Sequence, residues 1–474
     1  MKARILCILL IALLIAAVPA SAEVTYEVFV RAFADSDGDG VGDLKGLMRK
    51  LDYLSELGVD SLWLMPVFPS PSYHGYDVTD YRSINPEYGT MEDLEALLAD
   101  AHSRGMAVIL DLPINHTSID HPWFRERPEF YRWADERANL DLRVWGEKVW
   151  KPYGDTWYYA IFWDGMPDLD YENPDVRDEM IDIALYWLDM GVDGFRLDAA
   201  SHIYGMGEWS ARQEIERSAS WWVEFQIACV AKNPNCYLLG EAWESLDKRA
   251  ALLAGLDAAV NFDVGGAIIA LLRTGGSGKG YVRNLALTYA AYAEVRPGIP
   301  DAPFLTNHDQ NRVYAALGAK PERAKMAANM LLTLPGNPIL YYGEEIGMMG
   351  AKPDEEIRTP MLWGGGDRSE TRWHPSIYNT RTLTVAEQDA DPDSLLNHYR
   401  RLLAFRRAHP ALTGGEFDAA DVGNDIVAAY ALSTPEERAL IIHNATAVQQ
   451  ETAEGVIPAC TSLIVVDGER WTFP

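Results

Sequence analysis

The chain carries Gly194-Phe195-Arg196-Leu197-Asp198-Ala199-Ala200-Ser201-His202, and our interpretation of the fold starts from this segment. A helix-like segment ends at Gly191 just before it, so residues 193–197 are predicted to form a short strand. Side chains alternate across a strand, so Arg196 and Asp198 point to the same side. A guanidinium beside a carboxylate lowers the pKa of that carboxylate and keeps it ionised. Such a carboxylate suits a nucleophile, and a structural ion pair is the alternative.

Three further stretches end an apolar run with polar residues. They are Val108–His116 (VILDLPINH), Tyr237–Glu241 (YLLGE) and Phe304–Asp309 (FLTNHD). In order and content, the four stretches resemble the four signature regions of the α-amylase family of retaining glycoside hydrolases. Four such matches in one order make a specific signal, whereas one alone would be weak.

Helix-like and strand-like segments alternate through much of the chain. Apolar spacing predicts a helix over residues 44–57, a strand over 59–64 and a helix over 91–103. Such alternation is typical of parallel β/α units. Combined with the resemblance, it implies an α/β fold. We expect a (β/α)8 TIM barrel with an inserted small domain after strand 3 and a C-terminal all-β domain.

The alternation fails between His116 and about Pro174, in a segment rich in Trp and Tyr that is too long for a structureless loop. Short strands return near the C-terminus. The expected segments are a signal peptide (1–22), the first part of the catalytic barrel (23–116), an inserted domain B (117–173), the second part of the barrel (174–410) and a C-terminal β-domain (411–474).

The N-terminus has the pattern of a secretory signal. Lys2 and Arg4 precede an apolar run over residues 5–18, and Ala20-Ser21-Ala22 is a small-residue cleavage site. An uncleaved membrane anchor is the alternative, but the run is short for a bilayer span. We therefore predict a secreted or periplasmic protein with no membrane partner after cleavage. The net charge of −29 argues against nucleic acid as a partner.

Cysteines outside the signal are Cys229, Cys236 and Cys460. An exported protein can form disulfides, and proximity in the sequence favours a Cys229–Cys236 pair. The odd count means that disulfides do not build the scaffold.

An acidic loop, Asp35-Ser36-Asp37-Gly38-Asp39-Gly40-Val41-Gly42-Asp43, follows the first predicted strand. Its alternating carboxylates and turn-permitting glycines match the first part of an EF-hand-like loop. A solvated acidic turn is the alternative, but carboxylates this close would repel one another without a cation. We predict a structural Ca²⁺ ion held by the side chains of Asp35, Asp37, Asp39 and Asp43 and by the carbonyl of Val41.

The resemblance implies further ligands and contacts. In α-amylases the positions that match Asn115, Asp170 and the backbone oxygen of His202 hold calcium, so a second Ca²⁺ ion is expected between barrel and insert. Tyr76 matches a residue that stacks under the sugar at the point of cleavage. Its neighbour Asp77 is expected to pair with a distant arginine such as Arg312.

The resemblance also implies the catalytic residues. Asp198 matches the nucleophile, and Glu241 matches the general acid that later acts as base; retention needs these two carboxyl groups about 5–5.5 Å apart. We expect apolar surroundings such as Trp243, and the nearby anion, to raise the pKa of Glu241. The third carboxylate, Asp309, would hold sugar hydroxyls and help distort the ring. His116 and His308 would hydrogen-bond sugar hydroxyls, and Arg196 would orient Asp198.

The expected substrate is an α-glucan such as starch or a maltodextrin. Ala199 stands where relatives that cleave α-1,6 bonds usually carry Val, which favours α-1,4 cleavage. Ser201 stands where many α-amylases carry a Lys that contacts sugar on the leaving-group side, which leaves the mode of action open. The alternatives are an oligo-α-1,6-glucosidase, a glucan transglycosylase or a maltose isomerase (trehalose synthase) on the same site. A non-catalytic sugar-binding protein is disfavoured because Asp198, Glu241 and Asp309 are all present. The sequence does not predict the oligomeric state.

Overall fold

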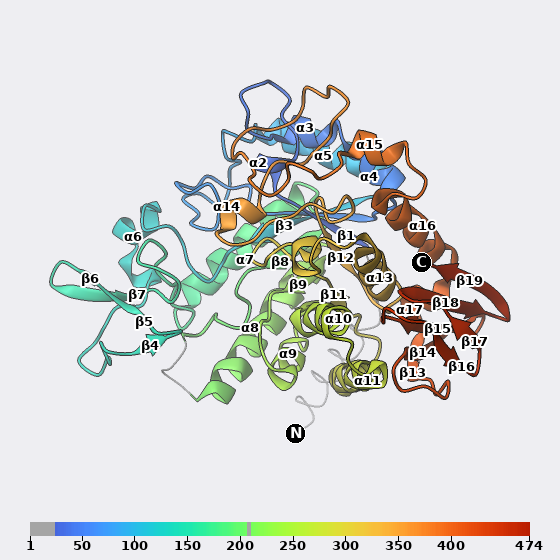
Figure 1. The fold of residues 1–474 in the computed structure, drawn as a ribbon. Helices are drawn as coiled ribbons and strands as arrows, with labels where there is room; N and C mark the ends of the chain where they lie inside the picture. The colour runs from blue at the N-terminus through green and yellow to red at the C-terminus, as the bar shows by residue number, and fades with distance from the viewer. Residues whose placement is uncertain (1–23, 206–209) are drawn as a thin grey trace.

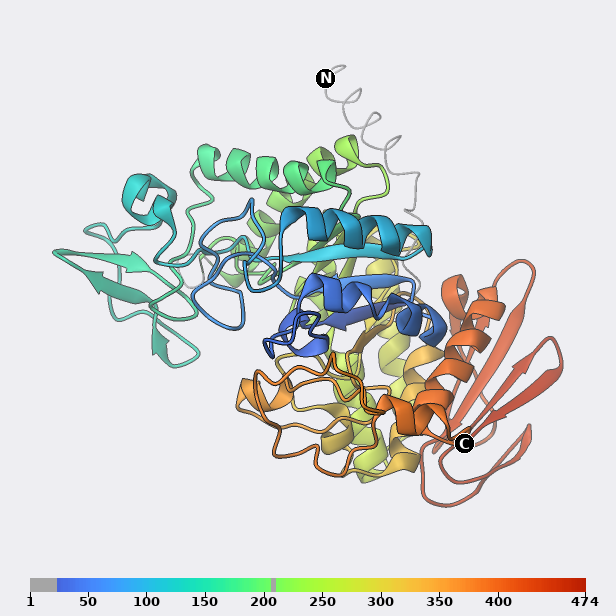
Figure 2. The same cartoon turned by 90° about the horizontal axis from the view of Figure 1, so that it is seen from above.

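The structure, a computed structural model, describes residues 24–205 and 210–474, so the predicted signal peptide lies outside the described residues. Within these residues, eight parallel strands follow one another in a nearly closed barrel (Figures 1 and 2). A parallel bridge between Phe304 and Ile339 links the two ends of the sheet. The strands are β1 (Thr25–Val28), β2 (Ser61–Leu64), β3 (Ala107–Leu112), β8 (Gly194–Leu197), β9 (Tyr237–Gly240), β10 (Ala258–Asn261), β11 (Ala302–Pro303) and β12 (Ile339–Tyr341).

The barrel strands are apolar on both faces because both faces are buried. Leu239 lies inside the barrel and packs in a cluster with Trp63, Ile109 and Phe304. Its neighbour Leu238 points outward into the core shared with the surrounding helices. This alternation fixes which strand residues can reach the interior, and side chains that follow the last residue of each strand lie at the carboxyl rim.

Helices surround the barrel (Figure 1). The helix predicted over residues 44–57 is broken at Arg49 and Lys50 into α3 (Leu44–Met48) and α4 (Leu51–Leu57). The helix predicted over 91–103 is confirmed as α5 (Met91–Ser103), which begins in a capping box formed by Thr90 and Asp93. The other long helices are α7 (Pro174–Asp189), α8 (Ala211–Lys232), α9 (Leu246–Leu252), α10 (Phe262–Thr274), α11 (Gly278–Val295), α13 (Pro321–Leu332) and α16 (Leu395–Ala408).

An insert lies between β3 and α7 and projects from the barrel (Figures 1 and 2). Its core is formed by aromatic and aliphatic side chains, among them Val149, Trp150 and Tyr159. A bridge between His116 and Asp168 joins the insert to the barrel. The elements of the insert are α6 (Pro122–Glu126), η1 (Pro128–Phe130) and the hairpins β4 (Arg143–Val144)–β5 (Glu147–Lys148) and β6 (Trp150–Tyr153)–β7 (Thr156–Tyr159).

The C-terminal part is an antiparallel β-domain, as predicted. Its sheet has the order β13-β14-β15-β18-β19, with a separate β16–β17 hairpin. Tyr430 and His443 from this sheet meet Thr333, which follows α13, and this contact fixes the domain to the barrel. The strands are β13 (Glu416–Ala419), β14 (Ala428–Ser433), β15 (Arg438–Asn444), β16 (Gln450–Thr452), β17 (Gly455–Ile457), β18 (Thr461–Val466) and β19 (Glu469–Phe473).

The structure bears on two questions raised by the sequence, the predicted disulfide and membrane-spanning helices. Cys229 and Cys236 are both buried and carry free thiols, so the predicted disulfide is wrong for this structure, as is any pairing of Cys460. A side-chain hydrogen bond to Cys229 and burial raise the pKa of the Cys236 thiol, so the two sulfurs are neighbours without a bond. Among the helices of the described residues, none is long and apolar enough to span a bilayer.

Candidate active site

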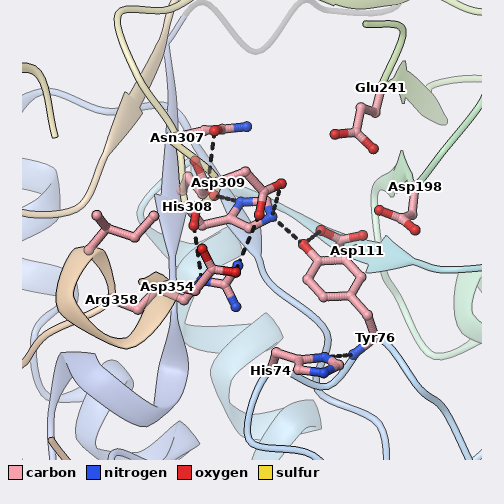
Figure 3. Close-up of polar contacts among 12 residues, drawn as sticks. His74, Tyr76, Asp111, Asp198, Glu241, Asn307, His308, Asp309, Asp354 and Arg358 are labelled. Atoms are coloured by element: carbon pink, nitrogen blue, oxygen red, sulfur yellow. Dashed lines mark hydrogen bonds and ion pairs between the residues drawn. The ribbon is translucent and has the colours of Figure 1, made fainter. Parts of the chain in front are cut away.

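The polar residues of the four signature-like stretches meet at the carboxyl rim of the barrel. Asp198 follows the last residue of β8, and Glu241 follows the last residue of β9. Asp309 lies in the loop after β11 and faces the same region (Figure 3). In a β/α barrel this rim is where catalytic groups from different strands converge.

Arg196 connects the carboxylates on one side of the rim. Its Nη1 donates to Asp198 Oδ1 at 2.7 Å and to Asp111 Oδ1 at 3.0 Å. Its Nη2 lies 3.0 Å from Glu241 Oε2. Asp198 and Glu241 therefore face each other across one buried guanidinium group. Asp111, which sequence reasoning did not single out, also accepts a hydrogen bond from Trp63 Nε1.

Burial outweighs the guanidinium in setting the protonation of these acids. Burial raises the pKa of Asp198 to about 6, although Arg196 acts in the opposite direction. Arg196 lowers this pKa, as expected from the sequence, but burial outweighs it and the charge of Asp111 adds to the rise. Burial, and then the charges of Asp198 and Asp309, raise the pKa of Glu241 against the effect of Arg196. The residue Trp243 is 63% exposed, so it gives Glu241 little apolar cover.

The backbone between the two carboxylates is strained. Ala199 has a φ of 48°, in the left-handed region that a residue with a side chain rarely adopts. This conformation lets the Ala199 N–H donate to Glu241 Oε2 at 3.0 Å. The residue after Asp198 therefore helps to hold Glu241 in place.

The other side of the rim gives Asp309 two cationic partners. Arg358 Nη2 donates to Asp309 Oδ1 at 2.9 Å, and His308 Nε2 lies 3.1 Å from Asp309 Oδ2 (Figure 3). Burial alone would raise the pKa of Asp309, but His308 and Arg358 hold it well below its usual range. Arg358 follows α14 (Asp354–Ile357), and no strand-end pattern in the sequence marks it as part of the site.

Tyr76 joins the two sides. Its hydroxyl donates to Asp111 Oδ2 at 3.0 Å and lies 2.7 Å from His308 Nε2. Its ring stacks on the His308 ring at 5.5 Å between centroids. Tyr76 is 9% exposed, so only a small part of the residue is open to a ligand.

His116 lies beside the site but turns toward the protein. It is fully buried, and its Nδ1 lies 3.1 Å from Asn115 Oδ1. Its Nε2 lies 3.1 Å from the Tyr76 carbonyl oxygen. Burial lowers the pKa of His116 to about 4, so the ring is neutral. A neutral ring has one N–H, so only one of these two carbonyl oxygens can accept from His116. The hydrogen bond from His116 to a sugar stays a prediction.

The predicted pair of Asp77 and Arg312 is wrong. Asp77 accepts hydrogen bonds from the hydroxyls of Ser70 at 2.6 Å and Ser72 at 2.7 Å. Arg312 instead donates to the carbonyl oxygens of Ile357 and Tyr342. Asp77 is served by neighbouring hydroxyls, whereas Arg312 is turned toward backbone carbonyls and its Nη2 has no partner among the described residues.

The acidic loop brings together some of its predicted metal ligands. Carboxylate oxygens of Asp35, Asp37 and Asp39 all lie within 4.8 Å of one another, a spacing that suits a hard cation with oxygen ligands. The two oxygens of Asp43 accept from the backbone N–H groups of Ser36 and Gly46, and the second contact caps α3. Both oxygens of Asp35 likewise accept from backbone N–H groups, and the role of Asp43 as a ligand stays a prediction.

The predicted junction ligands are arranged differently from expectation. The Asn115 side chain hydrogen-bonds Asp168, not Asp170, so Asp168 is the acidic neighbour in this region. Asp170 accepts from the Glu172 N–H and lines a cavity of about 570 Å³ beside the insert. The Asn115 amide nitrogen donates to the His202 carbonyl oxygen at 2.5 Å. Asn115 and the His202 carbonyl therefore lie side by side, and the second calcium ion between barrel and insert stays a prediction.

Comparisons with known proteins agree with this architecture. A family model described as the α-amylase catalytic domain matches residues 27–415. "Alpha-amylase 3" of Dictyoglomus thermophilum is 41% identical over 418 residues, covering 86% of this chain and 81% of that protein. A "4-alpha-glucanotransferase" of Thermotoga maritima is 34% identical, covering 77% of this chain and 82% of that protein.

The crystal structure of an α-amylase from H. orenii superposes with a TM-score of 0.85 at 40% sequence identity, covering 94% of this chain and 99% of that one. The family model spans most of the barrel, and the relatives extend over most of their own lengths. The relatives carry the names of both hydrolases and transferases, so they establish the family of this chain but not the reaction that it catalyses. This chain belongs to the α-amylase family of glycoside hydrolases and transferases.

Proposed function

We propose that this protein is an exported, retaining glycoside hydrolase that cleaves α-1,4-glucosidic bonds in starch and maltodextrins. The observation that carries the proposal is the pair of Asp198 and Glu241, which lie at the barrel rim with side chains 12% and 16% exposed and both contact Arg196. The similarity to a protein named α-amylase supports the substrate class. The N-terminal sequence pattern supports export to the periplasm or the exterior.

The proposed reaction uses the two carboxyl groups in different protonation states. Asp198, ionised above pH about 6, attacks the anomeric carbon and forms a glucosyl ester. Glu241, with a raised pKa, donates its proton to the departing glycosidic oxygen. It then takes a proton from the water that hydrolyses the ester, which restores both groups.

The other side of the rim supplies binding and charge. Asp309 stays ionised and accepts from sugar hydroxyls, while its negative charge stabilises the cationic character of the transition state. Tyr76 offers a ring edge to the sugar, and Arg358 fixes the orientation of Asp309. Arg196 orients Asp198 through the 2.7 Å contact.

Glucan transfer is the second candidate, because the same glucosyl ester can react with a sugar hydroxyl in place of water. The similarity to a protein named 4-alpha-glucanotransferase supports it. A structural feature also favours it: Trp243, two residues after Glu241, stacks on Phe262 at 4.5 Å and leaves its indole largely exposed. An exposed indole beside the acid is a surface on which an acceptor sugar can stack.

Product analysis separates these candidates. Incubation with maltoheptaose, isomaltose and pullulan, followed by chromatography, should give shorter maltooligosaccharides from maltoheptaose. Products longer than the substrate would identify a transferase. Cleavage of isomaltose without cleavage of maltoheptaose would overturn the α-1,4 assignment.

The nucleophile is tested by trapping. The Glu241→Gln variant with an activated α-glucosyl fluoride should accumulate an enzyme whose mass is raised by one glucosyl residue on the peptide that contains Asp198. Asp198→Asn should abolish the adduct and turnover while it still binds maltoheptaose. The control is Asp182→Asn, on the exposed face of α7, which should behave like the unmodified enzyme. An adduct on any other residue contradicts the assignment.

Calcium is proposed as a structural ion in the acidic loop, held by Asp35, Asp37 and Asp39 with the Val41 carbonyl. A bound cation would neutralise carboxylates that repel one another and would stabilise the loop without entering the reaction. Calorimetric titration of the chelator-treated protein should show calcium binding. Added calcium should also raise the melting temperature of the protein. Asp37→Asn should weaken both effects, and Asp52→Asn, on the exposed face of α4, should not. Equal binding by both variants would place the ion elsewhere.

A further inference from the structure

Glu27, near the end of β1, is buried beneath the catalytic rim. It is 0% exposed, and its Oε1 contacts Nδ1 of His308, which is 281 residues away in the sequence. Its other oxygen, Oε2, has no hydrogen-bond partner among the described residues. The charge of Glu27 is therefore balanced mainly by His308. A buried carboxylate is costly unless such a partner neutralises it.

The hydrogen bonds around His308 determine how many protons its ring carries. The Tyr76 hydroxyl has one proton and donates it to Asp111, which Arg196 also contacts. Toward His308 Nε2, at 2.7 Å, the Tyr76 oxygen must then act as the acceptor. Asp309 Oδ2, 3.1 Å from the same nitrogen, is also an acceptor when ionised. His308 Nε2 must therefore carry a proton.

The second nitrogen faces Glu27, with which it can share one proton. Carboxyl groups are stronger acids than imidazolium, with ordinary pKa values of about 4.3 and about 6.5. A second carboxylate, Asp309, flanks the opposite edge of the ring and favours the charged form further. The shared proton therefore belongs on His308 Nδ1, which makes the ring an imidazolium between two carboxylates.

We propose that Glu27 is a positioning residue that keeps His308 doubly protonated and aims its Nε2–H at Asp309 and the bound sugar. This inference rests on the proposed function for its catalytic consequence, but the protonation of His308 stands by itself. His308 would then be a fixed cation of the site, and Asp309 a fixed anion beside it. A neutral histidine would donate a weaker hydrogen bond to the same oxygens.

The surroundings of His308 support this assignment. Burial opposes its charge, but Asp309 and Glu27 together raise the pKa of His308 to about 10. The edge of the Trp63 ring faces the imidazole at 5.8 Å, and Arg358 Nε donates to the His308 carbonyl oxygen. The titratable and charged groups that face or influence His308 are Glu27 from β1, Tyr76 from the loop after β2, Asp111 from β3, Asp309 from its own loop, and Arg358 after α14.

The sign of the pH effect follows from this geometry. The pKa of His308 in the folded protein lies above its unfolded value, so the stabilising pairs are complete below pH about 6.5. They are lost only as pH rises through about 10. In Glu27→Gln the neutral amide cannot balance the imidazolium. Burial then dominates, and the pKa of His308 should fall by about two units or more.

Nuclear magnetic resonance of the full protein with labelled histidine tests the protonation without turnover. His308→Gln identifies the signals by their disappearance. In the unmodified protein both His308 nitrogens should show imidazolium shifts at pH 8, and in Glu27→Gln at least half of the rings should be neutral at that pH. The proposal is overturned if His308 is neutral at pH 8 in the unmodified protein, or if its pKa in Glu27→Gln stays within about half a unit of the original.

Kinetics test the catalytic consequence. The ratio of kcat/KM for Glu27→Gln to that of the unmodified enzyme, measured with maltoheptaose, should fall about tenfold between pH 6 and pH 9, because only the variant loses the His308 charge. Using the ratio cancels the titration of Asp198 and Glu241, which both enzymes share. A constant ratio would show that the His308 charge does not serve the reaction. Absence of activity in both enzymes would instead contradict the proposed function.

The matched control is Glu437→Gln. Glu437 precedes β15, and its side chain is 15% exposed. It contacts His409 Nδ1 at 2.8 Å and accepts from the Ala411 N–H at 2.9 Å, so it is a carboxylate paired with a histidine outside the site. This variant should leave both the His308 pKa and the pH dependence of the kinetic ratio unchanged. An equal effect from Glu437→Gln would reveal a general effect of losing such a pair in place of a specific role for Glu27.

Discussion

On one side of the rim, Arg196 contacts the carboxylates of Asp111, Asp198 and Glu241. On the other side, Asp309 contacts two cations. The side chains of the first three acids are at most 16% exposed, and that of Asp309 is 33% exposed. Burial raises the pKa of each, yet the net pKa shifts run in opposite directions. Asp198 and Glu241 are raised, and Asp309 is lowered.

The comparison shows that burial does not by itself decide protonation at this rim. The direction follows from how many cations serve each carboxylate. Three acids that share one guanidinium retain raised pKa values, which suits a pair that must exchange a proton during the reaction. One acid held by His308 and Arg358 stays charged throughout, which suits a group that binds and stabilises a cationic transition state.

Removing the shared cation should have the largest effect. Arg196→Met leaves three buried carboxylates unbalanced, and the free energy of unfolding should fall by about 3–5 kcal/mol. The pKa values of these acids would rise further above their unfolded values. The loss should therefore be greatest at pH 8 and smaller at pH 5, where the acids are protonated. Urea unfolding at both values of pH measures it.

Arg31→Met is the control for that experiment. The Arg31 side chain is only 11% exposed, but its ion-pair partner Glu87 is 51% exposed at the side chain. Its removal should destabilise the protein with little difference between pH 5 and pH 8. A matching pH dependence in the two variants would show that the carboxylates near Arg196 are not strained by the loss of their cation.

Removing one of the two cations near Asp309 should cost less. Arg358→Met takes away the 2.9 Å charge-assisted hydrogen bond but leaves His308 in place. Such a bond contributes about 1.5–3 kcal/mol, so kcat/KM with maltoheptaose should fall roughly 10- to 100-fold. The exposed residue Arg381 offers the control, and Arg381→Met should be fully active. Full activity of Arg358→Met would mean that His308 alone suffices for Asp309.

The pH dependence of kcat/KM should follow the ionisation of Asp198, one of the three acids that share Arg196. Asp198 must be ionised to attack, and its pKa is about 6. The value of kcat/KM should therefore fall about tenfold for each unit below pH 6, which corresponds to about 1.4 kcal/mol at pH 5. Because the pKa of Asp309 is lowered, its protonation should not contribute to the decrease in kcat/KM below pH 6. An acid limb near pH 4 would show that Arg196 outweighs burial after all.

The strands and carboxylates that could be predicted are those marked by a pattern in the local sequence. Asp198 and Glu241 end apolar runs, and the structure places both at strand ends. Strand β10 (Ala258–Asn261) was not predicted, because two of its four residues are alanines, which have little β-propensity. Strand β10 is buried because the barrel closes around it, and no periodic pattern in the sequence indicates that burial.

Partners of the catalytic groups could not be predicted, because they depend on how distant strands come together. Glu27 reaches His308 from the first strand of the barrel, and Arg358 reaches Asp309 from a loop 49 residues away. Asp168 rather than Asp170 lies beside Asn115 because of the register of the His116–Asp168 bridge. Register is a tertiary property, and a shift of a few residues in it changes every contact of the segment.

The smallest expected effect concerns the link between Asp198 and Glu241. Ala199 keeps a left-handed backbone that costs a non-glycine residue about 1–2 kcal/mol, and its N–H serves Glu241. Ala199→Gly removes that strain but adds freedom to the unfolded chain, so the net gain in unfolding free energy should be below about 1 kcal/mol. Because the N–H remains, kcat should change little. Ala199→Val adds a β-branched side chain to the same conformation and should lose both stability and activity. Unchanged stability and activity in Ala199→Val would show that the backbone at this position can relax. The hydrogen bond from the Ala199 N–H to Glu241 would then not be needed for the reaction.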